Sequence, residues 1–125
     1  MHIIATQEAP QAIGPYSQAI VTNDLVFTLG QIPLTAAGEI VAGSIQTQTE
    51  QVFDNLEAVL RSAGSALNQA VSVTVFMTDL RQFPEMNEIF ARRFGTHRPA
   101  RSTVQVVALP TGAQIEINAV ARVAA

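Results

Sequence analysis

The strongest constraint on the fold is a long amphipathic segment near the middle of the chain. Ser44 is a favourable N-cap residue, and Gly64 is suited to end a helix. Between them, from about Ile45 to Ala63, apolar residues recur at helical spacing: Ile45, Val52, Leu56, Val59, Leu60 and Ala63. A helix with one apolar side must bury that side, so the rest of the chain has to supply a sheet that packs against it.

Two apolar runs before this helix predict a β-hairpin. The expected strands are Ser17 to Val21 and Leu25 to Leu29, joined by a turn at residues 22–24. The second strand, LVFTL, is apolar at nearly every position, which is typical of a strand whose two faces are both covered. In a protein of one domain the second cover is often another subunit. Residues 30–43 form an irregular connection to the helix.

After the helix, a strand pattern is followed by a second helical pattern. Residues 70–78 have a period of two and predict a strand. Its apolar side would consist of Val71, Val73, Val75 and Met77. The second helix has Pro84 in its first turn and Gly95 at its end. Its apolar stripe consists of Phe83, Met86, Phe90 and Phe94.

Two more strands, Ser102 to Val107 and Gln114 to Val123, close the chain. The predicted order is therefore ββαβαββ within one domain of residues 1–125. We expect an α+β fold in which two helices pack on one face of a mixed sheet. The other face is a natural assembly surface, because a chain with 48% hydrophobic and 14% charged residues leaves apolar surface for copies of itself to cover.

The last two strands carry the charged pair of greatest chemical interest. Val104 and Val106 alternate with Arg101 and Thr103, and Glu116 alternates with apolar residues. If the apolar sides of both strands face the helices, Arg101 and Glu116 project together from the opposite face. Two interpretations are open. The pair could be a plain ion pair, or Arg101 could bind a substrate carboxylate while Glu116 orients or deprotonates a water molecule.

The residue inventory limits the chemistry further. The chain has no cysteine and no lysine, which excludes a thiolate nucleophile, a cysteine-based metal site and a lysine Schiff base. His2 and His97 are too few for a His-rich metal site, and no triad or phosphate-loop motif occurs. Because no signal peptide or run of membrane-spanning length is visible, we expect a cytoplasmic protein with no membrane partner.

The charge distribution argues against a nucleic-acid partner in general but leaves one basic zone. The net charge is −3 and the sequence pI is about 5.2, which disfavours long-range attraction to nucleic acid. No acidic residue occurs between Glu88 and Glu116, a span that holds Arg92, Arg93, His97, Arg98 and Arg101. For Arg92 and Arg93 the simplest interpretation is a solvated helix end favoured by the helix dipole.

A series of short motifs extends over essentially the whole chain. In order they are AIGPYSQAI, GQIPL, QTEQVFDNLEAVLRSAG, VTVFMTDL, MNEIFARRF, RPARSTVQV, ALP and IEINAVA. This order resembles the Rid family, also called the YjgF-like or endoribonuclease L-PSP family, and RPARS with the downstream IEI is its most specific part. The greatest similarity is to the RidA branch, the 2-iminobutanoate/2-iminopropanoate deaminases.

The resemblance implies a fold, an assembly and a reaction. The implied fold is chorismate-mutase-like, and the implied assembly is a homotrimer with three sites in clefts between subunits. The implied reaction is hydrolysis of reactive enamines and imines, released by pyridoxal-phosphate enzymes, to a 2-keto acid and ammonia. No cofactor and no metal are implied. This chemistry suits the inventory, because a 2-imino acid has one carboxylate and one electrophilic carbon.

The resemblance also assigns residues. Arg101 matches the arginine that holds the substrate carboxylate, and Glu116 matches the glutamate that positions the attacking water. The residues that match the lining of the cleft are Tyr16, Gly30 and Asn87, together with Thr103, which stands where many members carry cysteine. For Tyr16, a packing role is the alternative.

One departure from the family pattern concerns Leu29. The usual string is SGQIP, whereas this chain has LGQIP, so a polar group near the cleft is replaced by an apolar one. We interpret this as a change in substrate preference. Two alternatives to the deaminase remain: a non-enzymatic metabolite-binding, regulatory or chaperone-like trimer, and a ribonuclease or translation inhibitor that uses the basic zone.

Overall fold

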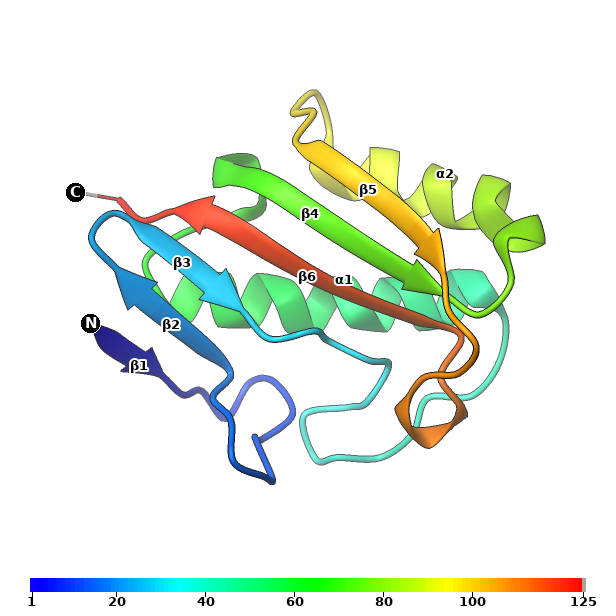
Figure 1. The fold of residues 1–125 in the computed structure, drawn as a ribbon, viewed down its shortest axis with the longest axis horizontal. Helices are drawn as coiled ribbons and strands as arrows, with labels where there is room; N and C mark the ends of the chain where they lie inside the picture. Colours follow the sequence, from blue (N-terminus) through cyan, green and yellow to red (C-terminus); the bar gives the residue numbers. More distant parts are fainter. Residues whose placement is uncertain (125) are drawn as a thin grey trace.

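Two α-helices lie on one face of a six-stranded mixed sheet in the computed structural model, which describes residues 1–124 (Figure 1). The strands are β1 (His2–Ile4), β2 (Ala19–Thr22), β3 (Leu25–Thr28), β4 (Ala70–Met77), β5 (Ala100–Gln105) and β6 (Ile115–Arg122). The helices are α1 (Ile45–Ser62) and α2 (Phe83–Phe94), with short 3-10 turns η1 (Leu67–Gln69), η2 (Leu80–Gln82) and η3 (Pro110–Gly112). The predicted arrangement of two helices on one face of a mixed sheet is confirmed.

The strand order is β1-β2-β3-β6-β4-β5, and every neighbouring pair is antiparallel except β4 and β5. A parallel pair needs a crossover connection, and α2 supplies it. The sequence did not predict β1, which pairs with β2 and places the N-terminal residues at one edge of the sheet. Three residues are too few to show a periodicity, so this strand is recognisable only from its pairing.

Helix α1 begins and ends as its sequence predicts. The Ser44 hydroxyl accepts a hydrogen bond of 3.1 Å from the backbone N–H of Thr47, which satisfies one of the free donors of the first turn. Gly64 has φ of 79°, a left-handed conformation that ends the helix without strain. The helix therefore presents a full apolar side to the sheet.

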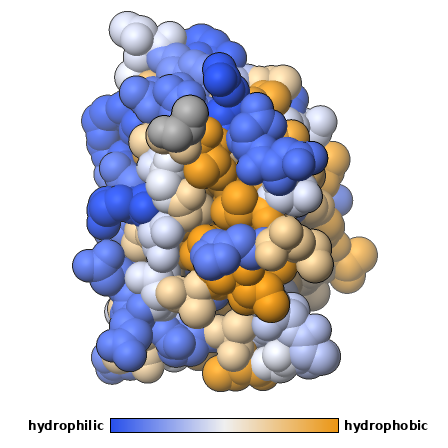
Figure 2. Space-filling model, turned by 90° about the vertical axis from the view of Figure 1, so that its left-hand side faces the viewer, coloured by the Kyte–Doolittle hydropathy of each residue, from blue (hydrophilic) through white to orange (hydrophobic). Residues whose placement is uncertain are grey.

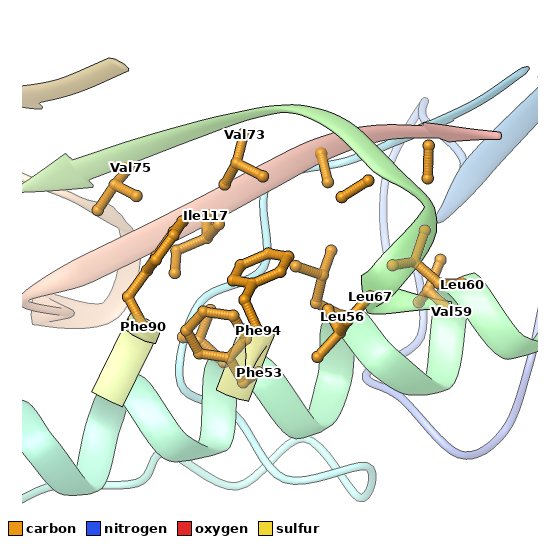
Figure 3. Packing of buried hydrophobic residues seen from close by; sticks show 14 of the residues in the cluster. Phe53, Leu56, Val59, Leu60, Leu67, Val73, Val75, Phe90, Phe94 and Ile117 are labelled. Carbon is orange, nitrogen blue, oxygen red and sulfur yellow. The ribbon is translucent and has the colours of Figure 1, made fainter. Parts of the chain in front are cut away.

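The core is organised around three phenylalanine rings where the two helices meet (Figure 3). The Phe53 ring of α1 contacts Phe90 and Phe94 of α2 edge to face, with centroids 5.8 and 5.6 Å apart. Such arrangements are favoured by the ring quadrupoles. Val73 and Ile117 cover the same cluster from the sheet. Of the apolar stripe predicted for the second helix, Met86, Phe90 and Phe94 are core as expected, whereas Phe83 is partly buried at its edge.

One predicted apolar position is wrong. Val71 is exposed, whereas Val73, Val75 and Met77 are buried as predicted. The register with β6 shifts between Ala70 and Ser72, so Val71 is the extra residue of a β-bulge and leaves the alternation.

The face of the sheet opposite the helices carries an apolar row. Ile3, Ile20, Phe27 and Val120 lie opposite one another across β1, β2, β3 and β6. Phe27 is 44% exposed in the single chain, so the second cover predicted for its strand is not supplied by the chain itself. Figure 2 also shows an apolar band between hydrophilic margins, on the side where the two termini and the β2–β3 turn lie.

Within residues 1–124, no helix is long and apolar enough to cross a membrane.

Candidate active site

Arg101 and Glu116 lie on opposite faces of the sheet, so the prediction that they share a face is wrong. In the parallel β4–β5 register Arg101 is the partner of Val73, which is buried beneath the helices. In the antiparallel β4–β6 register Glu116 is the partner of Phe76, on the other side of β4. Because side chains alternate along a strand, Arg101 points to the helix side and Glu116 to the open side.

The error has a physical cause at the edge of the sheet. Strand β5 is the last strand, and α2 covers its helix side with aromatic and amide groups. The guanidinium carbon of Arg101 lies 4.6 Å from the ring centroid of Phe90 and 5.2 Å from that of Phe83. A planar guanidinium stacks well on aromatic rings, so an arginine can occupy a position that alternation assigns to an apolar side chain. Val104 takes the open side and is 41% exposed.

Arg101 is half-buried and has no carboxylate partner among residues 1–124. Its Nη1 donates a hydrogen bond of 2.7 Å to Oδ1 of Asn87, a neutral acceptor. Burial lowers the pKa of Arg101 from its ordinary value, but a guanidinium remains protonated at neutral pH. The remaining N–H donors of the fork are therefore available to an anion such as a carboxylate.

Thr103 lies two residues further along β5, on the same side as Arg101. Its hydroxyl Oγ1 is buried and has no hydrogen-bond partner, which is unusual for a buried polar atom. We call Arg101, Asn87 and Thr103, with the Phe83 and Phe90 rings, the arginine half-site. It brings together three of the residues that the family resemblance assigned.

On the other side of the sheet, an open cavity of about 600 Å³ contains Glu116. We call it the glutamate cavity. Its wall is mainly apolar and includes Ile13, Tyr16, Leu29, Gly30, Gln31 and Glu116. It brings together Tyr16, Gly30 and Glu116, the other three assigned residues, and adds Leu29. Tyr16 is exposed rather than packed in the core, so the packing alternative is not supported.

Gly30 is required here for space. A Cβ atom at this position would lie 2.2 Å from Oε2 of Glu116 and 2.6 Å from its Cδ, well inside contact distance. The approach is fixed by the next residue, because Gln31 and Ile117 exchange backbone hydrogen bonds of 2.8 and 3.1 Å. The carboxyl of Glu116 is thus held against the Gly30 backbone.

Burial raises the pKa of the Glu116 carboxyl, which makes the ionised form a better proton acceptor. Gln31, which the sequence did not single out, is 2% exposed, and its amide Nε2 has no hydrogen-bond partner among residues 1–124. Gln31 pairs with the buried Ile117, so its side chain lies on the helix side of the sheet, opposite to the Glu116 carboxyl.

The two half-sites do not meet within one copy of the chain. Strand β4 lies between β5, which carries Arg101, and β6, which carries Glu116. Their partners on β4, Val73 and Phe76, are three residues apart, so the Cα atoms of Arg101 and Glu116 are separated by roughly 14 Å within the sheet. Within residues 1–124, no group of three histidine or acidic side chains is placed to hold a metal ion. One face therefore carries a half-buried guanidinium whose partner is the neutral Asn87, and the other face carries the half-buried carboxyl of Glu116.

Two helices packed on one face of a mixed six-stranded sheet are the arrangement of chorismate-mutase-like α+β proteins. A family model described as Endoribonuclease L-PSP matches residues 6–123. The chain belongs to this endoribonuclease L-PSP family, also called the Rid or YjgF-like family.

Relatives and solved structures agree with this assignment. The chain is 48% identical to a RutC family protein of Pyrococcus horikoshii over 120 residues, 95% of each chain. It is 46% identical over 122 residues to the Reactive Intermediate Deaminase A, chloroplastic, of Arabidopsis thaliana, covering 95% of this chain and 64% of that protein. The E. coli protein TdcF, in a crystal structure with bound serine, superposes with a TM-score of 0.93 at 41% identity, covering 99% and 100% of the two chains.

Proposed function

We propose that this protein hydrolyses reactive 2-imino acids, such as 2-iminobutanoate and 2-iminopropanoate, to 2-keto acids and ammonia without a cofactor. The observation that carries the proposal is the half-buried guanidinium of Arg101, which has a neutral partner in Asn87 and no carboxylate among residues 1–124. A deaminase name on a relative 46% identical supports the same reaction. The carboxylate-bearing serine bound to TdcF is also in keeping with it.

The reaction needs only the groups described above. A water oxygen adds to C2 of the protonated imine as the Glu116 carboxylate accepts a proton from that water. Glu116 then returns this proton to the nitrogen, the C2–N bond breaks as the hydroxyl oxygen forms the C2=O bond, and ammonia leaves while the hydroxyl proton passes to solvent. One water is consumed and no electrons are transferred. Arg101 holds the carboxylate in its two-pronged geometry, so that C2 lies where the water attacks.

The substrate can touch both groups only if the half-sites come from different copies. We therefore propose a homotrimer in which the arginine half-site of one copy faces the glutamate cavity of the next. The apolar row of Ile3, Ile20, Phe27 and Val120 supports this assembly, because an uncovered apolar sheet face is a typical interface.

A coupled assay tests the reaction. A pyridoxal-phosphate dehydratase generates 2-iminobutanoate from threonine, and the appearance of 2-ketobutanoate is followed with and without this protein. We expect acceleration by the natural chain and by Arg122→Ala, whose exposed arginine lies outside both half-sites. Arg101→Ala should lose the acceleration. Equal rates with the natural chain and with buffer would end the deaminase proposal.

Mixing two inactive variants tests the shared site. In a trimer refolded from equal amounts of Arg101→Ala and Glu116→Gln, about a quarter of the sites combine an intact Arg101 from one copy with an intact Glu116 from its neighbour. Activity should return to about that fraction of the natural value. No recovery in trimers shown by native mass spectrometry to be mixed would mean that one chain supplies both groups.

The ribonuclease alternative has less support in the structure than in the sequence. The basic zone it would use is partly neutralised, because Arg92 and Arg93 pair with acidic residues of α1. The non-enzymatic alternative predicts binding of 2-keto or amino acids with no turnover in the same assay.

A further inference from the structure

We propose that the glutamate cavity selects 2-imino acids whose side chain is bulkier and more apolar than the methyl or ethyl group of 2-iminopropanoate or 2-iminobutanoate. The chemical class is that of imines with branched aliphatic side chains, such as the imine of leucine. This inference rests on the proposed function and assigns the cavity within it.

The first argument is size. In a single copy the cavity has a volume of about 600 Å³, in the range that proteins use for whole small-molecule ligands, and the neighbouring arginine half-site of the proposed trimer would fill part of it. Arg101 of the neighbouring copy takes the carboxylate, and Glu116 with its water takes C2. The side chain is then the only part of the substrate left to fill the remaining apolar volume.

The second argument is the chemistry of the wall next to the reacting carbon. Leu29 directly precedes Gly30, against which the Glu116 carboxyl is held. Its backbone is fixed on both sides: its N–H donates to the Gln18 carbonyl at 2.9 Å, and its carbonyl accepts from the Thr28 hydroxyl at 2.9 Å. An isobutyl group is therefore held where it would contact the first carbons of a substrate side chain.

The third argument is that apolar surface continues from Leu29 around the cavity. Ile32 and Leu34 line the wall, and Ile13 lies at the rim with 88% of its surface exposed. A methyl group would leave most of this surface in water, whereas an isobutyl group would cover part of it. Burial of apolar area favours the larger substrate.

The test compares imines formed from alanine and leucine by an amino-acid oxidase. We expect kcat/KM for the leucine imine to exceed that for 2-iminopropanoate by at least about tenfold, the usual value of added carbons in an apolar pocket. Leu29→Ser should reduce this ratio by about tenfold. Leu80→Ser is the matched control, because Leu80 is exposed and lies outside the cavity, and should leave the ratio unchanged.

A binding measurement separates failure of the inference from failure of the proposed function. Calorimetry with 4-methyl-2-oxopentanoate and pyruvate, the two stable products, reports cavity preference without turnover, and the natural chain suffices if Leu29→Ser does not fold. Tighter binding of 4-methyl-2-oxopentanoate without hydrolysis of either imine would support the cavity assignment and overturn the deaminase. Hydrolysis of both imines with equal kcat/KM, and equal binding of both products, would overturn the assignment and leave the deaminase standing. Neither binding nor hydrolysis would overturn both.

Discussion

Arg93 and Arg101 occupy similar surroundings but differ in their electrostatic partners. Each guanidinium lies over a ring of the phenylalanine cluster: Arg93 is 5.4 Å from the centroid of Phe53, and Arg101 is 4.6 Å from that of Phe90. Both are partly buried, and both are positioned by α2. Stacking on an aromatic ring therefore does not distinguish them.

Their acidic neighbours do distinguish them. The Arg93 guanidinium contacts three carboxylates of α1, at 2.9 Å from Glu50, 3.0 Å from Asp54 and 2.9 Å from Glu57. Arg101 has only the neutral Asn87. Arg93, whose charge is balanced, joins α1 to α2. Arg101 is desolvated without an acidic partner among residues 1–124, which is the basis for proposing that it binds a ligand. It also corrects the interpretation of Arg93 as a solvated helix end, because its side chain is only 18% exposed.

The largest expected effect follows from replacing Arg101. Arg101→Ala should lower kcat/KM for 2-iminobutanoate by about a hundredfold or more, because the substrate carboxylate loses a charged two-pronged partner. Arg101→Lys should recover only part of this, since an ammonium keeps the charge but not the fork. Steady-state kinetics of both variants, normalised to folded protein, give the measurement. If Arg101→Ala instead lost much stability and kept a normal kcat/KM, Arg101 would be a residue that stabilises the fold, as Arg93 is, and not one that binds the substrate.

The second effect concerns the other half-site. In Gly30→Ala the new methyl would collide with the Glu116 carboxyl, which has to move by about an ångström or more. Displacement of a catalytic group by that distance costs up to about a hundredfold in rate. Because the loss acts through Glu116, Gly30→Ala should have little further effect in a Glu116→Gln background. Additive losses in this double-mutant cycle would contradict the steric explanation.

The third effect follows from replacing Arg93, which should lower stability and leave activity unchanged, the opposite of the expectation for Arg101. Arg93→Ala should destabilise the fold by about 1–3 kcal/mol, because it leaves three neighbouring carboxylates without their shared cation. Its activity per folded molecule should be normal. Arg92→Ala is the neighbouring control: Arg92 is more than half exposed and pairs with Glu50 alone, so about 0.5 kcal/mol or less is expected. Urea unfolding measures both. Similar losses in the two variants would mean that the cluster around Arg93 is no more than a surface ion pair.

The contrast between the two arginines also shows what the sequence could and could not predict. The helices, the β2–β3 hairpin and the last strand follow from periodicity and capping residues, because those signals are local. The partners of Arg93 were not predicted, since Glu50, Asp54 and Glu57 meet it only through packing of α1 on α2.

For the candidate site, the structure tests the arrangement of the predicted residues, and the arrangement was wrong. The family motifs nominated Arg101 and Glu116, and alternation placed Arg101 on the wrong face. Alternation assumes that the side of a strand facing a helix is apolar. That assumption fails where α2 offers aromatic rings and Asn87 to an edge strand. Gln31 was missed because a buried polar side chain is detected by its lack of a partner, which only the structure reveals.

The smallest expected effect is the contribution of Glu116 to the pH dependence of the free energy of unfolding. Burial raises the pKa of Glu116 above the ordinary glutamate value of about 4.3. The folded state then binds this proton more tightly than the unfolded chain. Stability should fall slightly as pH rises from the ordinary value through the raised one, and should remain constant above it. Glu116→Gln removes this slope.

Activity must change in the opposite direction with pH, because Glu116 accepts a proton only when it is ionised. As pH falls through its raised pKa, kcat/KM should decline while the contribution of this group to stability is recovered. Urea unfolding of the natural chain and of Glu116→Gln at pH 4 and pH 7, beside the pH profile of kcat/KM, measures both. We expect the variant to gain stability relative to the natural chain only at pH 7. A natural chain that is stabilised by ionisation of Glu116 would show that this carboxylate has found a cationic partner, as Glu50 has in Arg93.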